Sequence, residues 1–374
     1  FDLVGAKGKG GAPDWVSLPS FLVRHVLDRF DVVLQYDRSK GIRARKGNDH
    51  FFRFLKGMDA FLGTSLSGVM PKGKDKLAAL DTRNQLPREP KRALELIDRF
   101  LIGARGRTKT VGGRRLAAPL QVAVVLDYAH FIVPQGDPLY VAVLSPTLIP
   151  ILQWGSDPAM SDGSAATVLI TENLADLNRA LTESSYSAKV HVTLPTAEEI
   201  RAFVADETKD ATDFEAVSDV SSEALAEKLV GLTRVSVRAL LRRALEGGER
   251  LTSDYLTRMK KELIEKEAAG RLEFIESPRT LDDVAGHDEA KAWLRQDAVL
   301  LRRGNTRALP MGDLLAGRIG TGKTYLVECL SGEIGIPCVE LRNFREKWVG
   351  ATEGNLEKVF SILHALGQVI VFVD

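Results

Sequence analysis

Cysteine and long apolar runs are both scarce in this sequence. The two cysteines, Cys329 and Cys338, lack metal-site spacing and fall within one expected helix–strand unit. We therefore expect reduced thiols rather than a disulfide framework. Residues 139–154 come closest to a membrane helix, but prolines interrupt them, and a membrane helix needs roughly 20 apolar residues. These shortages predict a cytoplasmic protein without a membrane partner.

Neither sign of charge is in excess. Lys and Arg total 51 and Asp and Glu total 50, so the overall charge selects no class of partner. Two basic stretches stand out locally, at residues 38–46 and 105–115. They could contact nucleic-acid phosphates or an acidic partner, although such runs are more often solvated loops. Nucleic acid is therefore kept only as a weakly supported partner.

Short apolar runs alternate with helical patterns, which predicts α/β modules with a parallel sheet and helices on both faces. The 374 residues are enough for two or three domains. We expect an α/β domain at residues 1–195, an all-helical subdomain at 196–275 and a second α/β module at 276–374. This second module is expected to be truncated, because the sequence stops directly after an apolar strand. Strands are expected at 1–4, 31–36, 121–126, 166–170, 188–194, 311–316, 338–341 and 368–373.

The strongest motif is Gly-Arg-Ile-Gly-Thr-Gly-Lys-Thr at residues 317–324, which fits the P-loop pattern G-x-x-x-x-G-K-[ST]. Its glycines let backbone N–H groups turn inward around phosphates. Lys323 would neutralise the β- and γ-phosphates, and the Thr324 hydroxyl would ligate Mg²⁺. The motif predicts ATP and Mg²⁺ as cofactors. The nucleotide-binding residues expected around it are Gly317, Gly320, Thr321, Gly322, Lys323, Thr324 and Tyr325.

A second acidic ligand is expected at Asp374, which ends the apolar run from Val369. At the carboxyl edge of a parallel sheet, such a carboxylate can hold the water shell of a metal ion beside the P-loop. Thr324 and Asp374 are therefore the predicted metal-binding residues. Lys323 and Asp374 are the predicted catalytic residues.

These motifs resemble the AAA (AAA+) clade of P-loop ATPases, a three-layer α/β/α fold with a helical lid. Residues 281–286 resemble the segment before the AAA P-loop, which implies that Asp283 and Ala285 line the adenine pocket. Residues 347–355 resemble an AAA pore loop, which implies that Trp348 and Val349 grip a polypeptide in the channel of a homo-hexamer. Residues 224–244 are similar to the helical lid of the family.

The first module resembles an AAA module that has lost its chemistry. Gly5–Ala12 keeps glycines at P-loop spacing, but Gly11 and Ala12 stand where Lys and Thr belong. Tyr128 follows Asp127 where the catalytic Glu of the family would be. The order of a degenerate and then an intact module most resembles AAA proteins of cyanobacteria and chloroplast genomes. That resemblance implies a bacterial cytosol or a plastid stroma as the location.

Three functions remain open at this stage. The full-length protein is either an ATP-driven protein-remodelling machine or a nucleotide-dependent scaffold or regulatory switch. A DNA-associated ATPase rests on the basic stretches alone. By the family resemblance, the catalytic Glu follows Asp374, so residues 1–374 should bind nucleotide with little hydrolysis.

Overall fold

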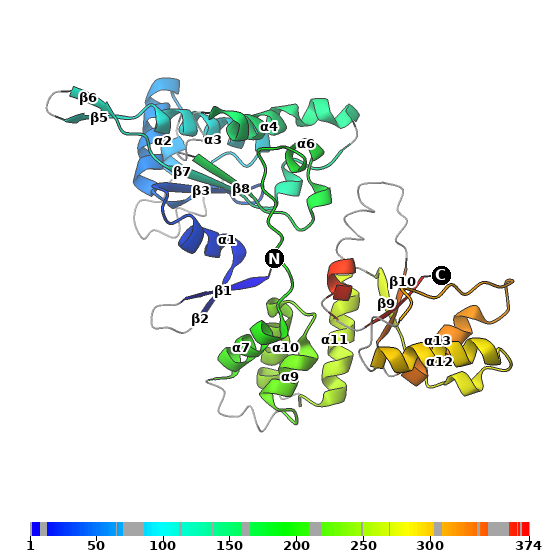
Figure 1. The fold of residues 1–374 in the computed structure, drawn as a ribbon. Helices are drawn as coiled ribbons and strands as arrows, with labels where there is room; N and C mark the ends of the chain where they lie inside the picture. Colours follow the sequence, from blue (N-terminus) through cyan, green and yellow to red (C-terminus); the bar gives the residue numbers. More distant parts are fainter. Residues whose placement is uncertain are drawn as a thin grey trace. The chain divides into compact units, whose positions relative to one another are not determined.

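The computed structural model forms two compact units, Phe1–His191 and Val192–Asp374 (Figure 1). The structure describes residues 2–7, 13–64, 66–69, 86–111, 114–136, 138–158, 165–209, 218–247, 250–268, 270–302, 309–334, 337–342, 359–364, 366 and 369–373. Among the helices of these described residues, none combines the length and the apolar character needed to cross a membrane.

The first unit is built on a four-stranded sheet with the order β4-β3-β7-β8. β3 (Val32–Asp37), β7 (Val122–Leu126) and β8 (Ala165–Leu169) run parallel, as their apolar character predicts. β4 (Gly41–Lys46) was not predicted, and it folds back antiparallel on β3. The basic stretch at 38–46 is therefore a hairpin and not a solvated loop.

Helices cover both faces of this sheet (Figure 1). One face packs on α2 (Asn48–Leu62), α3 (Pro90–Arg105) and α4 (Pro138–Ser156). The other face packs on α1 (Leu18–Phe21) and the π-helical turn η1 (Leu22–Val26). Successive strand residues point to opposite faces, so both faces of β3 and β7 are buried, and apart from Gln35 and Asp37 of β3 the core side chains there are hydrophobic.

Two antiparallel hairpins complete the first unit, β1 (Leu3–Lys7) with β2 (Pro13–Ser17) and β5 (Thr108–Val111) with β6 (Arg114–Ala117). The expected P-loop remnant at Gly5–Ala12 requires a parallel strand followed by a helix. Gly5–Lys7 instead belong to β1, and β1 joins β2 in a separate two-stranded sheet. That expectation is wrong for Gly5–Lys7, and the rest of the remnant lies outside the described residues.

The second unit begins with the predicted helical region. Its helices are α7 (Ala197–Thr208), α9 (Ser222–Leu229), α10 (Arg234–Gly247) and α11 (Ser253–Glu267). α7 opens with a capping box, in which the hydroxyl of Thr196 and the carboxylate of Glu199 each accept a bond from the other residue's backbone N–H. Arg238 of α10 bonds Glu207 of α7 through two guanidinium nitrogens, which ties these helices together.

A three-stranded sheet with the order β11-β10-β9 follows. β10 (Cys338–Leu341) runs parallel to β11 (Ile370–Phe372) and antiparallel to β9 (Leu272–Ile275). The helices α12 (Asp288–Arg302) and α13 (Lys323–Ile334) belong to this part of the unit. With the first unit and the helical region, it confirms the predicted α/β class with a helical subdomain.

Two of the expected strands are wrong. Residues 311–316 form no strand, and Gly312 and Asp313, which are poor strand formers, interrupt the apolar pattern there. Residues 188–194 alternate apolar and polar side chains but pair with no neighbouring strand among the described residues. Val190 is 84% exposed, so this alternation does not mark a buried sheet face.

Helix α13 approaches the backbone before it very closely. The hydroxyl of Ser331 donates to the carbonyl oxygen of Ile275 at 2.7 Å. A Cβ atom on Gly332 would overlap the carbonyl oxygen of Arg279 and lie 2.5 Å from that of Ser277. Only glycine therefore fits at this contact.

We expect Gly332→Ala to destabilise the second unit by about 2 kcal/mol, because a rigid carbonyl has to move. Gly57→Ala in α2 is the matched control, since a Cβ there meets nothing within 4 Å and should stabilise its helix by about 0.5–1 kcal/mol. Urea unfolding followed by circular dichroism measures both changes. Equal effects of the two substitutions would contradict the close approach.

Candidate nucleotide-binding site

The P-loop residues form a turn that leads directly into α13. Gly320 and Gly322 have φ angles of 84° and 83°, a left-handed conformation that glycine adopts without strain. The ammonium group of Lys323 folds back into the turn and donates to the carbonyl oxygens of Gly317 at 3.0 Å and Arg318 at 3.1 Å. The predicted lysine and the first glycine of the motif are therefore in contact.

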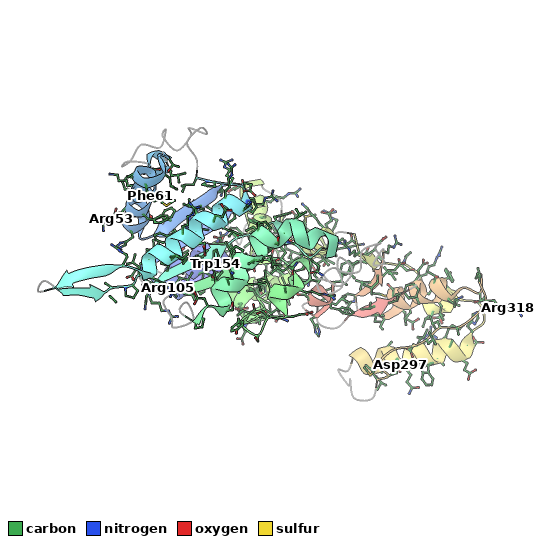
Figure 2. All side chains as sticks on the ribbon, turned by 90° about the horizontal axis from the view of Figure 1, so that it is seen from above. Arg53, Phe61, Arg105, Trp154, Asp297 and Arg318 are labelled. Carbon is green, nitrogen blue, oxygen red and sulfur yellow. The ribbon has the colours of Figure 1, made fainter. Side chains whose placement is uncertain are left out.

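Thr321 stabilises the same turn. Its hydroxyl and its backbone N–H donate to the carbonyl oxygen of Arg318 at 2.9 and 3.3 Å. This hydroxyl also lies 2.9 Å from the position that a Cβ on Gly317 would occupy. Three donors thus converge on the carbonyl of Arg318, which lies at an outer end of the unit (Figure 2).

The donors of this loop fit a polyphosphate. α13 is 12 residues long, and the free N–H groups of its first turn attract anions. Lys323 adds a full positive charge, and Thr324 is exposed in the first turn of the helix. No atom lies within 4 Å of a Cβ built on Gly320 or Gly322, so the loop is open on that side.

Of the other residues predicted for the nucleotide, metal and pore-loop sites, the structure describes some and not others. Asp374, Trp348 and Val349 lie outside the described residues. Within the part of the chain that the structure describes, no group of three or more His, Cys, Asp or Glu side chains could hold a metal ion.

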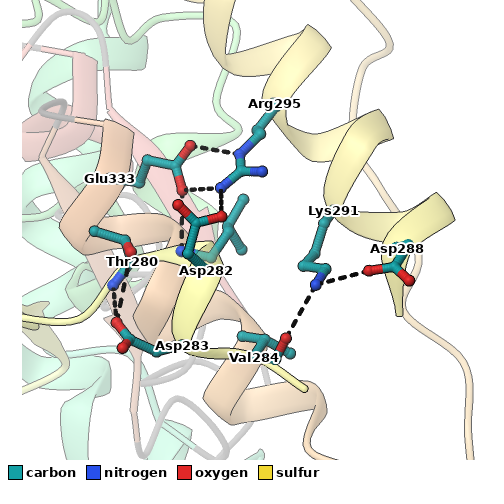
Figure 3. Close-up of polar contacts among 9 residues, drawn as sticks. Thr280, Asp282, Asp283, Val284, Asp288, Lys291, Arg295 and Glu333 are labelled. Carbon is teal, nitrogen blue, oxygen red and sulfur yellow. Dashed lines mark hydrogen bonds and ion pairs between the residues drawn. The ribbon is translucent and has the colours of Figure 1, made fainter. Parts of the chain in front are cut away.

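The segment 281–286, in which Asp283 and Ala285 are predicted to line the base, contributes to a short turn beside α12 and α13 (Figure 3). The turn η7 (Leu281–Asp283) is capped by Asp283, whose carboxylate accepts the backbone N–H of Thr280 at 2.7 Å. The carbonyl oxygen of Val284 accepts the ammonium group of Lys291 at 3.0 Å. Ala285 follows and is exposed.

Arg295 of α12 connects this turn to α13 (Figure 3). Its Nε and Nη2 atoms donate to the Glu333 carboxylate at 2.6 and 3.0 Å, and Nη2 also donates to Asp282 at 2.7 Å. The guanidinium lowers the pKa of the carboxyl groups of both Glu333 and Asp282. Sequence reasoning missed Arg295 and Glu333, because they are 38 residues apart and match no motif.

Tyr325 lies where the P-loop helix meets the turn. The guanidinium carbon of Arg279 is 5.3 Å from the centre of the tyrosine ring, a cation–π contact. Partial burial and a hydrogen bond with Cys329 raise the pKa of the Tyr325 hydroxyl, and the negative charge of Asp283 raises it further. The contact with Arg279 thus places Tyr325 against the segment that leads into the turn.

The first unit has a different arrangement at the carboxyl ends of its parallel strands. Asp127 follows β7 and is 6% exposed, and its carboxylate accepts Nε2 of Gln35 at 3.0 Å. The other carboxylate oxygen accepts the backbone N–H of Tyr128 at 3.1 Å. Burial raises the pKa of the Asp127 carboxyl group. An acid held in this way is poorly suited to ligate a metal ion.

The raised pKa of Asp127 predicts a pH dependence of stability. Between the ordinary aspartate pKa and the raised one, the folded state holds a proton that the unfolded state has lost, so stability falls as the pH rises. Asp127→Asn should remove this fall, and the amide that it introduces can donate to Oε1 of Gln35, which has no partner among the described residues. Thermal unfolding between pH 3 and 8 tests this. If the control Asp49→Asn flattened the dependence of stability on pH as well, the assignment of that dependence to Asp127 would be wrong.

Several basic side chains of the two basic stretches are already paired. Arg43 bonds Asp37, and Lys46 bonds Asp28. Arg105 bonds Asp157 at 3.1 Å, and Nη1 of Arg107 lies 2.8 Å from Nδ1 of His50. Figure 2 shows Arg105 at the end of α3, next to the β5–β6 hairpin. The three pairs with aspartates reduce the positive charge offered to nucleic acid.

The parallel strands, the helical subdomain and the glycine turn at the start of α13 define an α/β P-loop protein. Residues 1–193 match the family described as AAA+ chaperone, N-terminal Rossmann-like domain. Residues 198–269 match its second helical domain, and residues 314–374 match the ATPase family associated with various cellular activities. The chain belongs to the AAA+ chaperone family.

The sequence similarity to curated relatives covers a shorter stretch of the chain than the family matches do. The chain is 39% identical over 100 residues to an ATP-dependent zinc metalloprotease FtsH of Methylibium petroleiphilum, a match that covers 25% of this chain and 16% of that protein. It is 34% identical over 141 residues to FtsH 2 of Salinibacter ruber, covering 36% of this chain and 19% of the relative. The chain thus spans less than a fifth of the length of these relatives.

Proposed function

We propose that residues 276–374 bind Mg²⁺ and ATP as the ATPase module of a larger AAA+ protein. The observation that carries this proposal is the P-loop turn, in which Lys323 reaches the carbonyl oxygens of Gly317 and Arg318 at the start of α13. A positively charged group, left-handed glycines and free helix N–H groups coincide there. The match of residues 314–374 to the AAA ATPase family supports the same assignment.

The roles proposed for individual residues follow from this geometry. Bound ATP would supply the γ-phosphoryl group for transfer to water, and Mg²⁺ would neutralise charge on the phosphate oxygens. Lys323 would exchange its two carbonyl acceptors for charged phosphate oxygens, which form stronger hydrogen bonds. Thr324 and Asp374 would hold Mg²⁺, and Asp283, Ala285 and Tyr325 would line the base.

For the whole protein, we propose a homo-hexameric machine that remodels polypeptides, located in a bacterial cytosol or a plastid stroma. Trp348 and Val349 would grip the substrate in its channel. Residues 1–195 would be a pseudo-ATPase domain, a proposal supported by the buried Asp127 with its raised pKa, and residues 196–275 would be a helical lid. Residues 1–374 alone would bind nucleotide with little hydrolysis.

The first test of the proposed P-loop site is a measurement of ATP binding. We expect Lys323→Ala to weaken ATP binding to residues 1–374 by roughly 10- to 100-fold, because charge-assisted bonds to phosphate are lost. Lys189→Ala, which removes an exposed lysine remote in sequence from the P-loop, should leave the affinity unchanged. Isothermal titration calorimetry measures both dissociation constants. Equal affinities of wild type and Lys323→Ala would refute the site.

Turnover by the full-length protein separates the two main functions. A motor should hydrolyse ATP, lose turnover with Lys323→Ala and keep it with Trp348→Ala, because Trp348 is assigned to the substrate rather than to the nucleotide. If the full-length protein binds ATP but shows no turnover under any condition, the motor hypothesis fails and the hypothesis of a nucleotide-dependent scaffold or switch takes its place.

A further inference from the structure

We propose that Arg295 is a positioning residue that holds the base-side turn, residues 281–285, in place against the P-loop helix. This inference rests on the proposed nucleotide site and adds a residue that no motif indicates. Arg295 contacts neither the P-loop nor the predicted base-lining side chains through any bond described above. It would act through Asp282 and Glu333.

The guanidinium group of Arg295 pairs with carboxylates on two elements, the helix α13 and the turn η7. The Nε and Nη2 atoms of Arg295 bond both carboxylate oxygens of Glu333, in the last turn of α13, and Nη2 also reaches Asp282 in η7. Such planar, two-point pairing fixes orientation as well as distance. Glu333 further accepts the backbone N–H of Leu281 at 2.9 Å, so α13 holds Leu281 directly and α12 holds the next residue, Asp282, through Arg295.

A second contact from α12 holds the other end of the turn. The ammonium group of Lys291 donates to the carbonyl oxygen of Val284 at 3.0 Å and is itself held by Asp288 at 2.9 Å. Lys291 and Arg295 are four residues apart, so they lie on the same face of α12. Residues 282 and 284 flank Asp283, the first of the two residues predicted to line the base.

The P-loop has an independent set of contacts. Lys323 and Thr321 bond the carbonyl oxygens of Gly317 and Arg318, and none of these bonds involves α12. The turn itself reaches α13 near the end of that helix, where Leu281 bonds Glu333, and the residues just before the turn, Ser277 and Arg279, approach α13 at Gly332 and Tyr325. Loss of Arg295 should therefore loosen the base side and leave the phosphate side intact.

The test compares ATP with inorganic tripolyphosphate, which carries the phosphates without a base. Arg295→Met keeps most of the side-chain length and removes the guanidinium group. We expect it to weaken ATP binding to residues 1–374 by roughly tenfold and to leave tripolyphosphate binding unchanged. Arg295→Lys should recover part of the ATP affinity, because it still pairs with one carboxylate. Glu333→Gln should resemble Arg295→Met, while Glu289→Gln on the exposed side of α12 should have no effect.

The outcomes are distinct. If Arg295→Met weakened the binding of ATP and of tripolyphosphate equally, Arg295 would only support the fold in general, and the inference would be wrong. An unchanged affinity for ATP would also overturn it. Lys323→Ala should weaken both ligands, since it acts on the phosphates. A wild-type chain that binds neither ligand would overturn the proposed function, and the inference would fall with it.

Discussion

The close seating of α13 on the backbone of residues 275–284 is the contact on which the ATPase module depends. The P-loop leads into the first turn of this helix, Tyr325 meets Arg279 one turn from the loop, and Gly332 lets the far end touch two carbonyls. Ser331 and Glu333 add hydrogen bonds at the same end. One helix thus carries the phosphate loop and supports the segment that would face the base.

The two α/β modules use the carboxyl ends of their strands differently. In the first unit, Asp127 is buried, satisfied by Gln35 and the Tyr128 backbone, and has a raised pKa. In the second, the charged groups near the P-loop are exposed or half-exposed and remain able to exchange partners. This contrast suits a division in which one module contributes structure and the other binds a ligand.

Local patterns in the sequence predicted much of the fold of this molecule. The apolar runs of β3 and β7 and the P-loop spacing before α13 depend on neighbouring residues, which a sequence displays directly. The β4 strand escaped prediction because Arg and Lys dominate its composition. Arg295 and Glu333 escaped because only the packing of α12 on α13 brings them together. The expected strand at 311–316 failed because Gly312 and Asp313, which are poor strand formers, interrupt its apolar pattern.

The internal bonds of Lys323 bear on which ligands the proposed site would prefer. Its ammonium group is already satisfied by two neutral carbonyl dipoles. A neutral ligand offers it no better acceptor, whereas a multiply charged one does. Under the proposed function, the loop would therefore favour multiply charged ligands, because Lys323 gains nothing by giving up its backbone acceptors for a neutral one.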